Sequence, residues 1–131
     1  MTSIPDFHLT ASERTPMLHF AFAEGRFLIE GESYPEDVRS FYDTPMKVLE
    51  QWLSSGEQPV EFDFKLVYFN SASAKVFFNL MERLDNAAQA GRPCTVRWHH
   101  AADDDNIREL GEEFGTDLEA VIFELVAEED A

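Results

Sequence analysis

The residues of this chain that are best placed for chemistry follow one apolar segment directly. Leu66-Val67-Tyr68-Phe69 leads into Asn70-Ser71-Ala72-Ser73-Ala74-Lys75, where small polar side chains precede an amphipathic pattern. This is typical of a strand that ends at the carboxyl edge of a sheet and passes at once into a helix. The first N–H groups of a helix lack partners within it, and the helix dipole adds about half a positive charge there. The junction could therefore hold a phosphate group, although from these residues alone the simpler interpretation is that Asn70 or Ser71 is an ordinary helix cap.

Other candidate chemistry is sparse. His99-His100 lies beside Asp103-Asp104-Asp105 and could form a metal site, but adjacent residues of a strand point to opposite faces. We therefore expect no metal and interpret the acidic run as a solvated loop. The sequence holds no glycine-rich phosphate loop, G-x-S-x-G or H-E-x-x-H motif, and nothing positions Glu112-Glu113 as an acid–base pair. We expect a protein that is not an enzyme and uses no cofactor.

Composition limits the partners of the chain. Ten Lys and Arg against 26 Asp and Glu give a formal net charge of −16 in 131 residues. Nucleic acid and an anionic membrane surface would both be repelled, so we expect neither as a partner. A basic partner surface or plain solubility explains the charge equally well. No targeting signal and no apolar run of about 20 residues is visible, which predicts a cytoplasmic protein.

The elements that must position the junction alternate along the chain. Hydrophobic residues make up 44% of it, which predicts a single domain over residues 1–131 with a packed core. Apolar alternation predicts five strands, over residues 17–22, 26–31, 59–69, 94–99 and 121–126. Val67-Tyr68-Phe69 is fully apolar and predicts burial on both faces of the third strand. The single Cys94 excludes an internal disulfide and is expected to be buried.

Helical spacing predicts the segments between these strands. A helix begins near Tyr34-Pro35 and should break before Pro45, and a second piece follows over residues 45–53. A longer helix is predicted over residues 72–89, and a last one begins at Asp105 or Asn106. We interpret residues 1–16 as a loose arm and residues 127–131 as a solvated acidic tail.

The element order strand-strand-helix-strand-helix-strand-helix-strand predicts an α/β fold. The first two strands form a hairpin, which adds an antiparallel edge. The later strand–helix–strand repeats imply right-handed crossovers and parallel neighbours. A single mixed sheet with helices packed on it is the simplest arrangement.

Four segments of the chain resemble the SiaC family of bacterial regulatory phosphoproteins. They are Gly31-Glu32-Ser33-Tyr34-Pro35-Glu36, Tyr68-Phe69-Asn70-Ser71-Ala72-Ser73-Ala74-Lys75, Val96-Arg97-Trp98-His99 and Glu109-Leu110-Gly111-Glu112-Glu113-Phe114. The likeness extends from about residue 15 to residue 126, and the first two segments together are fairly specific. The family's phosphoacceptor lies at a junction similar to that of anti-anti-sigma (STAS) proteins, so the resemblance implies a STAS-like fold.

The resemblance also implies a switch protein. In the family, a partner kinase phosphorylates the hydroxyl residue directly after the Asn, and a PP2C-type phosphatase removes the phosphate. Carried onto this sequence, the acceptor is Ser71, where the family often has Thr, and Ser73 is the backup acceptor. The unphosphorylated best-known member binds and activates a diguanylate cyclase, which implies control of cyclic di-GMP and biofilm. Tyr68, Asn70 and Lys75 would then lie beside the phosphate or the docked partner.

The sequence leaves two other functions open. One is a constitutive protein-binding module of the same fold, in which Ser71 is only a cap. The other is a small-molecule or metal-dependent enzyme without a known motif. The identity of the effector and the formation of a homodimer are also left open. We expect Arg97 and Trp98 to serve the sheet rather than a partner.

Overall fold

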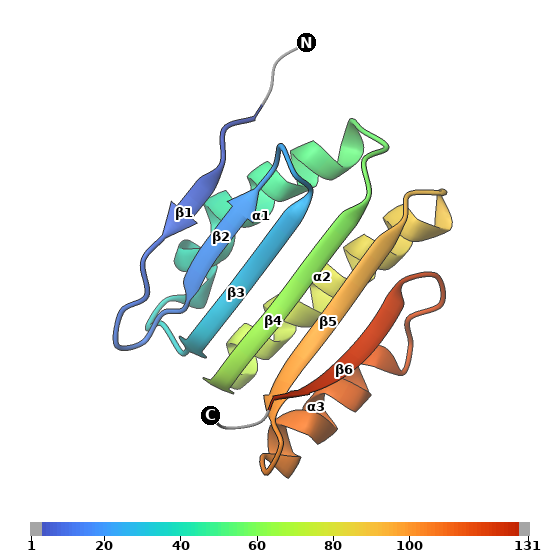
Figure 1. Ribbon diagram of the computed structural model, residues 1–131. Helices are drawn as coiled ribbons and strands as arrows, with labels where there is room; N and C mark the ends of the chain where they lie inside the picture. Colours follow the sequence, from blue (N-terminus) through green and yellow to red (C-terminus); the bar gives the residue numbers. More distant parts are fainter. Residues whose placement is uncertain (1–3, 129–131) are drawn as a thin grey trace.

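A computed structural model describes residues 4–128 as one twisted sheet with helices on a single face (Figure 1). The strands lie across the sheet in chain order, β1-β2-β3-β4-β5-β6. The strands are β1 (Phe7–Leu9), β2 (Met17–Ala21), β3 (Arg26–Ser33), β4 (Val60–Phe69), β5 (Cys94–Ala101) and β6 (Ile122–Glu128). The helices are α1 (Val38–Ser54), α2 (Ser71–Gln89) and α3 (Asp105–Gly115).

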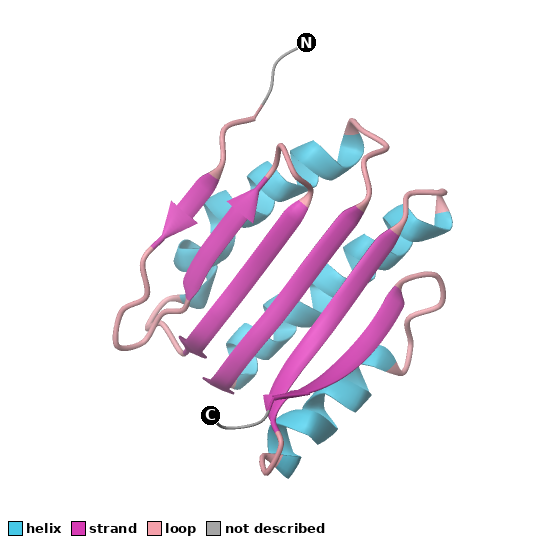
Figure 2. Ribbon diagram, in the orientation of Figure 1, coloured by secondary structure: helices cyan, strands magenta, loops and turns pink. Residues whose placement is uncertain are grey.

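The pairing of the strands makes the sheet mixed. β1, β2 and β3 pair antiparallel, whereas β3, β4, β5 and β6 are parallel neighbours. Each crossover between parallel strands advances by one position in the same direction, and right-handed crossovers of this kind place their helices on one face. Figure 2 shows the three helices behind the sheet and the front face bare. The predicted mixed, STAS-like α/β fold is confirmed.

The core lies between the sheet and the helices. In β4, Phe62, Phe64 and Leu66 are buried, while the alternate side chains Asp63 and Lys65 are only half-buried on the other face. The predicted burial of both faces at the end of β4 is wrong. Val67 is 65% exposed, because it continues the alternation of Asp63 and Lys65 on the face that no helix covers. Tyr68, at the irregularity in the pairing with β3, is 52% exposed.

The structure differs from the sequence prediction at the amino-terminal arm. Within residues 1–16, Phe7–Leu9 form the edge strand β1 instead of a loose arm, with Phe7 opposite Phe20 of β2. The two rings lie 6.0 Å apart between centroids, and Phe7 is half-buried against the core. Three residues are too short for a strand pattern to be recognised in the sequence.

The first helix is not broken at Pro45. α1 runs through it without interruption from the N-cap Asp37, whose side chain accepts a hydrogen bond from Ser40 N. The lost backbone donor costs stability, but Pro45 is buried against the core, and this apolar contact offsets part of the cost.

The carboxyl-terminal strand is longer than predicted. Residues 127 and 128 belong to β6 rather than to a tail, because they pair with His100 and Ala101. The rest of the predicted acidic tail lies outside the described residues. Within residues 4–128, no helix is long and apolar enough to cross a membrane.

Candidate functional site at the junction of β4 and α2

Asn70 caps the helix that follows β4. Its backbone is extended (φ −84°, ψ 172°), and its Oδ1 accepts a hydrogen bond from Ser73 N at 2.8 Å. Its carbonyl accepts the first helical bond from Ala74 N at 3.0 Å. Of the two residues that could cap α2, Asn70 therefore does so.

Ser71 is the first residue of α2, and its side chain is exposed. No hydrogen bond of its hydroxyl is found within the described part of the chain, so the oxygen is open to solvent. The N–H groups of Ser71 and Ala72 precede that of Ala74, which is the first donor of the helical bonds, and they have no partner within the helix. A hydroxyl and two backbone donors thus face solvent together at the positive end of a 19-residue helix.

Ser73 is fully buried, in contrast to Ser71. Its Oγ accepts a hydrogen bond from Ser33 Oγ at 2.9 Å, and Ser33 Oγ lies 2.6 Å from Tyr42 Oη. Burial raises the pKa of the Tyr42 phenol, so this group remains a neutral partner in the chain of hydroxyls. The backup role of Ser73 as an acceptor does not fit the folded protein, because a kinase cannot reach its hydroxyl.

The end of β3 supports the same junction. A bulge after Gly31, which has a φ of 117°, shifts the register so that Ser33 lies opposite Phe69. Ser33 O then accepts a hydrogen bond from Asn70 N at 3.1 Å. The ring of Tyr34 meets that of Tyr68 edge-on, with centroids 5.5 Å apart. Two segments that are far apart in the sequence therefore build one edge of the sheet.

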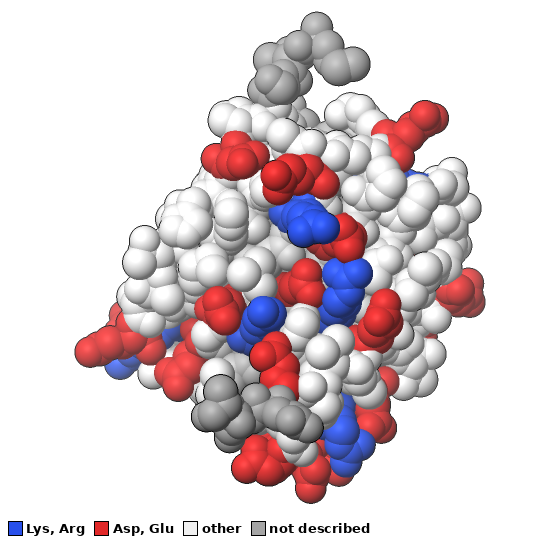
Figure 3. All heavy atoms as spheres, viewed as in Figure 1, with Lys and Arg blue, Asp and Glu red and all other residues white. Residues whose placement is uncertain are grey.

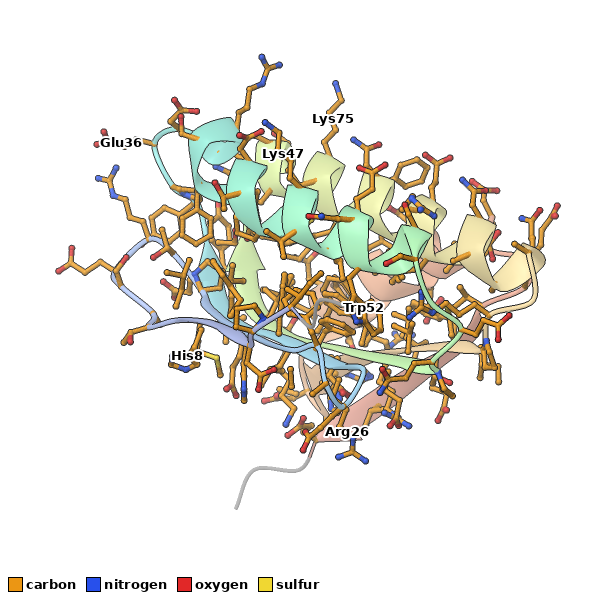
Figure 4. All side chains as sticks on the ribbon, turned by 90° about the horizontal axis from the view of Figure 1, so that it is seen from above. His8, Arg26, Glu36, Lys47, Trp52 and Lys75 are labelled. Carbon is orange, nitrogen blue, oxygen red and sulfur yellow. The ribbon has the colours of Figure 1, made fainter. Side chains whose placement is uncertain are left out.

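Lys75 lies four residues after Ser71 and is exposed. Figure 4 shows it on the side of the helices that faces away from the sheet, next to Lys47 of α1. No carboxylate of residues 4–128 lies within ion-pair distance of Lys75. Residues four apart lie on one face of a helix, so Lys75 is within reach of a group on Ser71. The structure thus brings Ser71, Lys75 and the exposed Tyr68 to one end of the molecule.

Sequence reasoning missed a groove that begins beside this junction. It lies between α1 and α2, has a volume of about 520 Å³, and includes Ala72 and Lys75 in its lining. The signal in the sequence was that four of the ten basic residues of an acidic chain fall in these two helices, where they balance the acidic residues. Arg39 and Lys47 come from α1, and Lys75 and Arg83 from α2.

The bare face of the sheet carries an ion-pair network. Figure 3 shows basic and acidic side chains interspersed across this face. Arg97 donates to Glu61 at 2.8 Å, and this hydrogen bond lowers the pKa of Glu61 and raises that of Arg97. His99 lies 2.7 Å from both Asp63 and Glu128. These pairs join neighbouring strands, as expected for Arg97.

The remaining predicted candidates are structural. Trp98 is fully buried, and its Nε1 donates to Ile107 O at 2.9 Å. His99 and His100 lie on opposite faces of β5, as expected. No group of three or more His, Cys, Asp or Glu suited to a metal occurs among residues 4–128. Cys94 is buried, which raises the pKa of its thiol.

A mixed sheet with helices on one face and a free serine hydroxyl at a strand–helix junction is the arrangement of a STAS-like regulatory domain. A model of the SiaC family regulatory phosphoproteins matches residues 9–128. The chain therefore belongs to the SiaC family of regulatory phosphoproteins, which confirms the resemblance seen in the sequence.

Individual proteins are similar over nearly the same length. An uncharacterized protein of Pseudomonas aeruginosa strain UCBPP-PA14 is 33% identical over 112 residues, covering 86% of this chain and 89% of the relative. The crystal structure of apo-SiaC from Pseudomonas aeruginosa has a TM-score of 0.87 at 33% identity and covers 95% of this chain and 100% of that one. Another structure holds the diguanylate cyclase SiaD of that organism in complex with its activator SiaC. Its TM-score is 0.85 at 30% identity, with 92% of this chain and 99% of that one covered.

Proposed function

We propose that this chain is a non-enzymatic switch protein whose reversible phosphorylation on Ser71 gates its binding to an effector. The observation that supports the proposal is the free, exposed hydroxyl at the first position of α2. Asn70 already makes the cap and Ser73 is buried, so Ser71 alone offers a reactive hydroxyl at this junction.

A phosphate on Ser71 would change the surface more than the fold. Phosphoserine adds about −1.5 to −2 charges and three acceptor oxygens. The free N–H groups at the start of α2 and the ammonium of Lys75 can receive these oxygens without moving the helix. A partner docked over Tyr68, Asn70 and Ser71 would have to desolvate the phosphate, which lowers the affinity of the partner.

The effector we propose is a diguanylate cyclase, so that the phosphorylation state controls the synthesis of cyclic di-GMP. Support comes from the related SiaC, which forms a complex with the cyclase SiaD as its activator. A partner kinase would add the phosphate and a PP2C-type phosphatase would remove it. The description of the family as regulatory phosphoproteins supports the proposal of a kinase and a phosphatase as partners.

The test is phosphosite mapping after incubation with the cognate kinase and ATP. Wild type should carry one phosphate, on Ser71, and Ser71→Ala should carry none. Ser73→Ala is the matched control and should be phosphorylated like wild type. Phosphate on another residue, or no phosphate, would contradict the switch and leave a constitutive binding module of the same fold. Intact-mass analysis of the protein from the native host is the second test, because a phosphorylated form would be seen there as an added phosphate mass.

The consequence for binding is tested with the purified diguanylate cyclase from the same genome. Ser71→Ala should bind it and raise its rate of cyclic di-GMP synthesis, whereas the phosphorylated wild type should do neither. Equal affinity of both forms for the cyclase would contradict the gating step.

A further inference from the structure

The groove between α1 and α2 has an apolar floor. Tyr42 and Leu49 of α1 and Leu80 of α2 form its buried base, and Met46 and Val76 are only half-buried beside them. The groove faces away from the sheet, so no element among residues 4–128 covers it (Figure 4). Half-buried apolar side chains along a groove of about 520 Å³ leave hydrophobic surface in contact with water.

The rim of the groove is basic, which is unusual for this chain. The whole sequence has ten Lys and Arg, and Arg39, Lys47, Lys75 and Arg83 all line this groove. Only two acidic residues, Asp43 and Glu50, are among its lining residues.

The two ends of the rim differ in their ion pairs. Lys47 lies 3.2 Å from Asp43, and Arg83 lies 3.7 Å from Glu50. Arg39 and Lys75, near the helix N-termini, have no carboxylate of the described chain within 4.0 Å. The free positive charge therefore lies at the end of the groove next to Ser71.

We propose that this groove is a docking surface for an acidic amphipathic helix of a partner protein. The apolar floor suits the hydrophobic stripe of such a helix, and the basic rim suits Asp and Glu on its flanks. The lining residues of α1 extend from Val38 to Leu53, which corresponds to about 22 Å or four turns of a docked helix. A basic or uncharged helix would leave Arg39 and Lys75 without counter-charges.

The surface deepens the proposed function and rests on it for the existence of a protein partner. A phosphate on Ser71 would lie beside Ala72 and Lys75, at the end of the groove where the unpaired cations are. It would neutralise Lys75 and repel the acidic flank of the docked helix. Loss of the partner on phosphorylation then needs no change in the fold.

The first experiment uses the unphosphorylated full chain and a designed probe. The probe is a fluorescent helical peptide of about 18 residues with Leu at positions i, i+3, i+4 and i+7 and Glu on both flanks. Fluorescence anisotropy should show saturable binding that weakens as salt is raised. The same peptide with every Glu replaced by Lys should bind at least about tenfold more weakly.

Variants locate the probe on the groove. The double variant Arg39→Glu/Lys75→Glu should weaken binding of the acidic peptide about tenfold, which is about 1.4 kcal/mol. Arg26→Glu/Lys65→Glu is the matched control, because it reverses two cations on the bare face of the sheet, and it should bind like wild type. Both changes lie at surface positions, and thermal melts followed by circular dichroism confirm that the variants are folded.

Two results would overturn the docking surface. One is equal binding of the acidic and basic peptides, and the other is unchanged binding by the double variant. Neither measurement involves the kinase or a phosphate. If the peptide does not bind in the groove, the hypothesis that Ser71 is phosphorylated is unaffected. If Ser71 is not phosphorylated, the peptide-binding result is likewise unaffected.

Discussion

At the scale of the residue, two serines that are two positions apart have opposite surroundings. Ser71 faces solvent, whereas Ser73 is buried and joined to Ser33 and through it to Tyr42. The difference follows from helix geometry, because residues at N1 and N3 point about 200° apart around the axis. One hydroxyl is therefore available for reaction, and the other stabilises the junction that presents it.

The two serines should differ in their contribution to stability. Ser73→Ala removes a buried hydrogen bond and should lower the free energy of unfolding by about 1 kcal/mol. Ser71→Ala removes an exposed hydroxyl and should change it by less than about 0.5 kcal/mol. Urea denaturation of both variants at neutral pH measures the difference. If both variants lost the same amount of unfolding free energy, Ser71 would have to make a stabilising contact of its own.

At the scale of the element, α3 depends on one glycine in its contact with β5. A Cβ on Gly111 would collide with Cδ1 and Nε1 of Trp98, and this indole is itself held by its bond to Ile107 O. Gly111 is thus required by the close approach of helix and strand, which explains its place in the segment Glu109-Leu110-Gly111-Glu112-Glu113-Phe114.

Gly111→Ala should therefore destabilise the fold in spite of the higher helix propensity of Ala. We expect a loss of about 2 kcal/mol, because the side chain overpacks a core without space for it. Trp98 fluorescence should shift as the ring moves. Glu113→Ala, an exposed change on the same helix, is the control and should stay within about 0.5 kcal/mol of wild type. An unchanged free energy of unfolding in Gly111→Ala would show that α3 can move away from β5 at little cost.

Asp85 joins α2 to the start of β6. Its Oδ1 accepts hydrogen bonds from the N–H groups of Glu119, Ala120 and Val121 at 3.0, 2.8 and 3.0 Å. Burial disfavours the charged form, but the backbone donors outweigh it and hold the pKa of Asp85 below its usual value. Asp85→Ala should therefore cost about 3 kcal/mol at pH 7.

The contribution of Asp85 should depend on pH in one direction. Because its pKa is lower in the folded state, the stabilisation is fully present above about pH 4, where the unfolded carboxyl is ionised. It is lost as the pH falls through the folded-state pKa. Urea denaturation between about pH 6 and pH 3 should show wild type and Asp85→Ala converging in acid. If the difference in unfolding free energy between wild type and Asp85→Ala stayed constant over this pH range, the lowered pKa of Asp85 in the folded state would be contradicted.

At the scale of the whole molecule, the charge of −16 makes regulation by one phosphate effective only where the local potential is positive. The lining of the α1–α2 groove has such an excess of positive charge, since it holds four of the ten basic residues of the chain and two acidic ones. We expect phosphorylated protein to bind the acidic peptide more weakly than unphosphorylated protein. The ratio of the two dissociation constants should approach one as the ionic strength rises from about 0.05 to 0.5 M, because salt screens the charge of the phosphate. A ratio of dissociation constants that does not change with salt would indicate that the phosphate acts through a conformational change instead.

The large aromatic content of the chain serves the core rather than an interface. Of twelve Phe residues, only Phe78 is among the exposed large hydrophobic residues. Among residues 4–128, the other exposed large apolar side chains lie at the end of β4, as Val67 and Tyr68, and on the edge strand β6, as Ile122 and Leu125.

The sequence by itself determined the alternation of strands and helices, the mixed sheet and the position of the junction at Asn70 and Ser71. The elements and the junction depend on local periodicity and on capping chemistry, which a single segment carries in its own residues. The mixed sheet follows from the order of these elements and from the handedness of the crossovers. The tertiary structure alone decided which faces are covered. It pairs β1 with β2, keeps α1 continuous through Pro45, buries Ser73 and leaves Val67 exposed. Periodicity shows that an element has an apolar face, but what covers that face, or leaves it in water, depends on neighbours from distant parts of the chain.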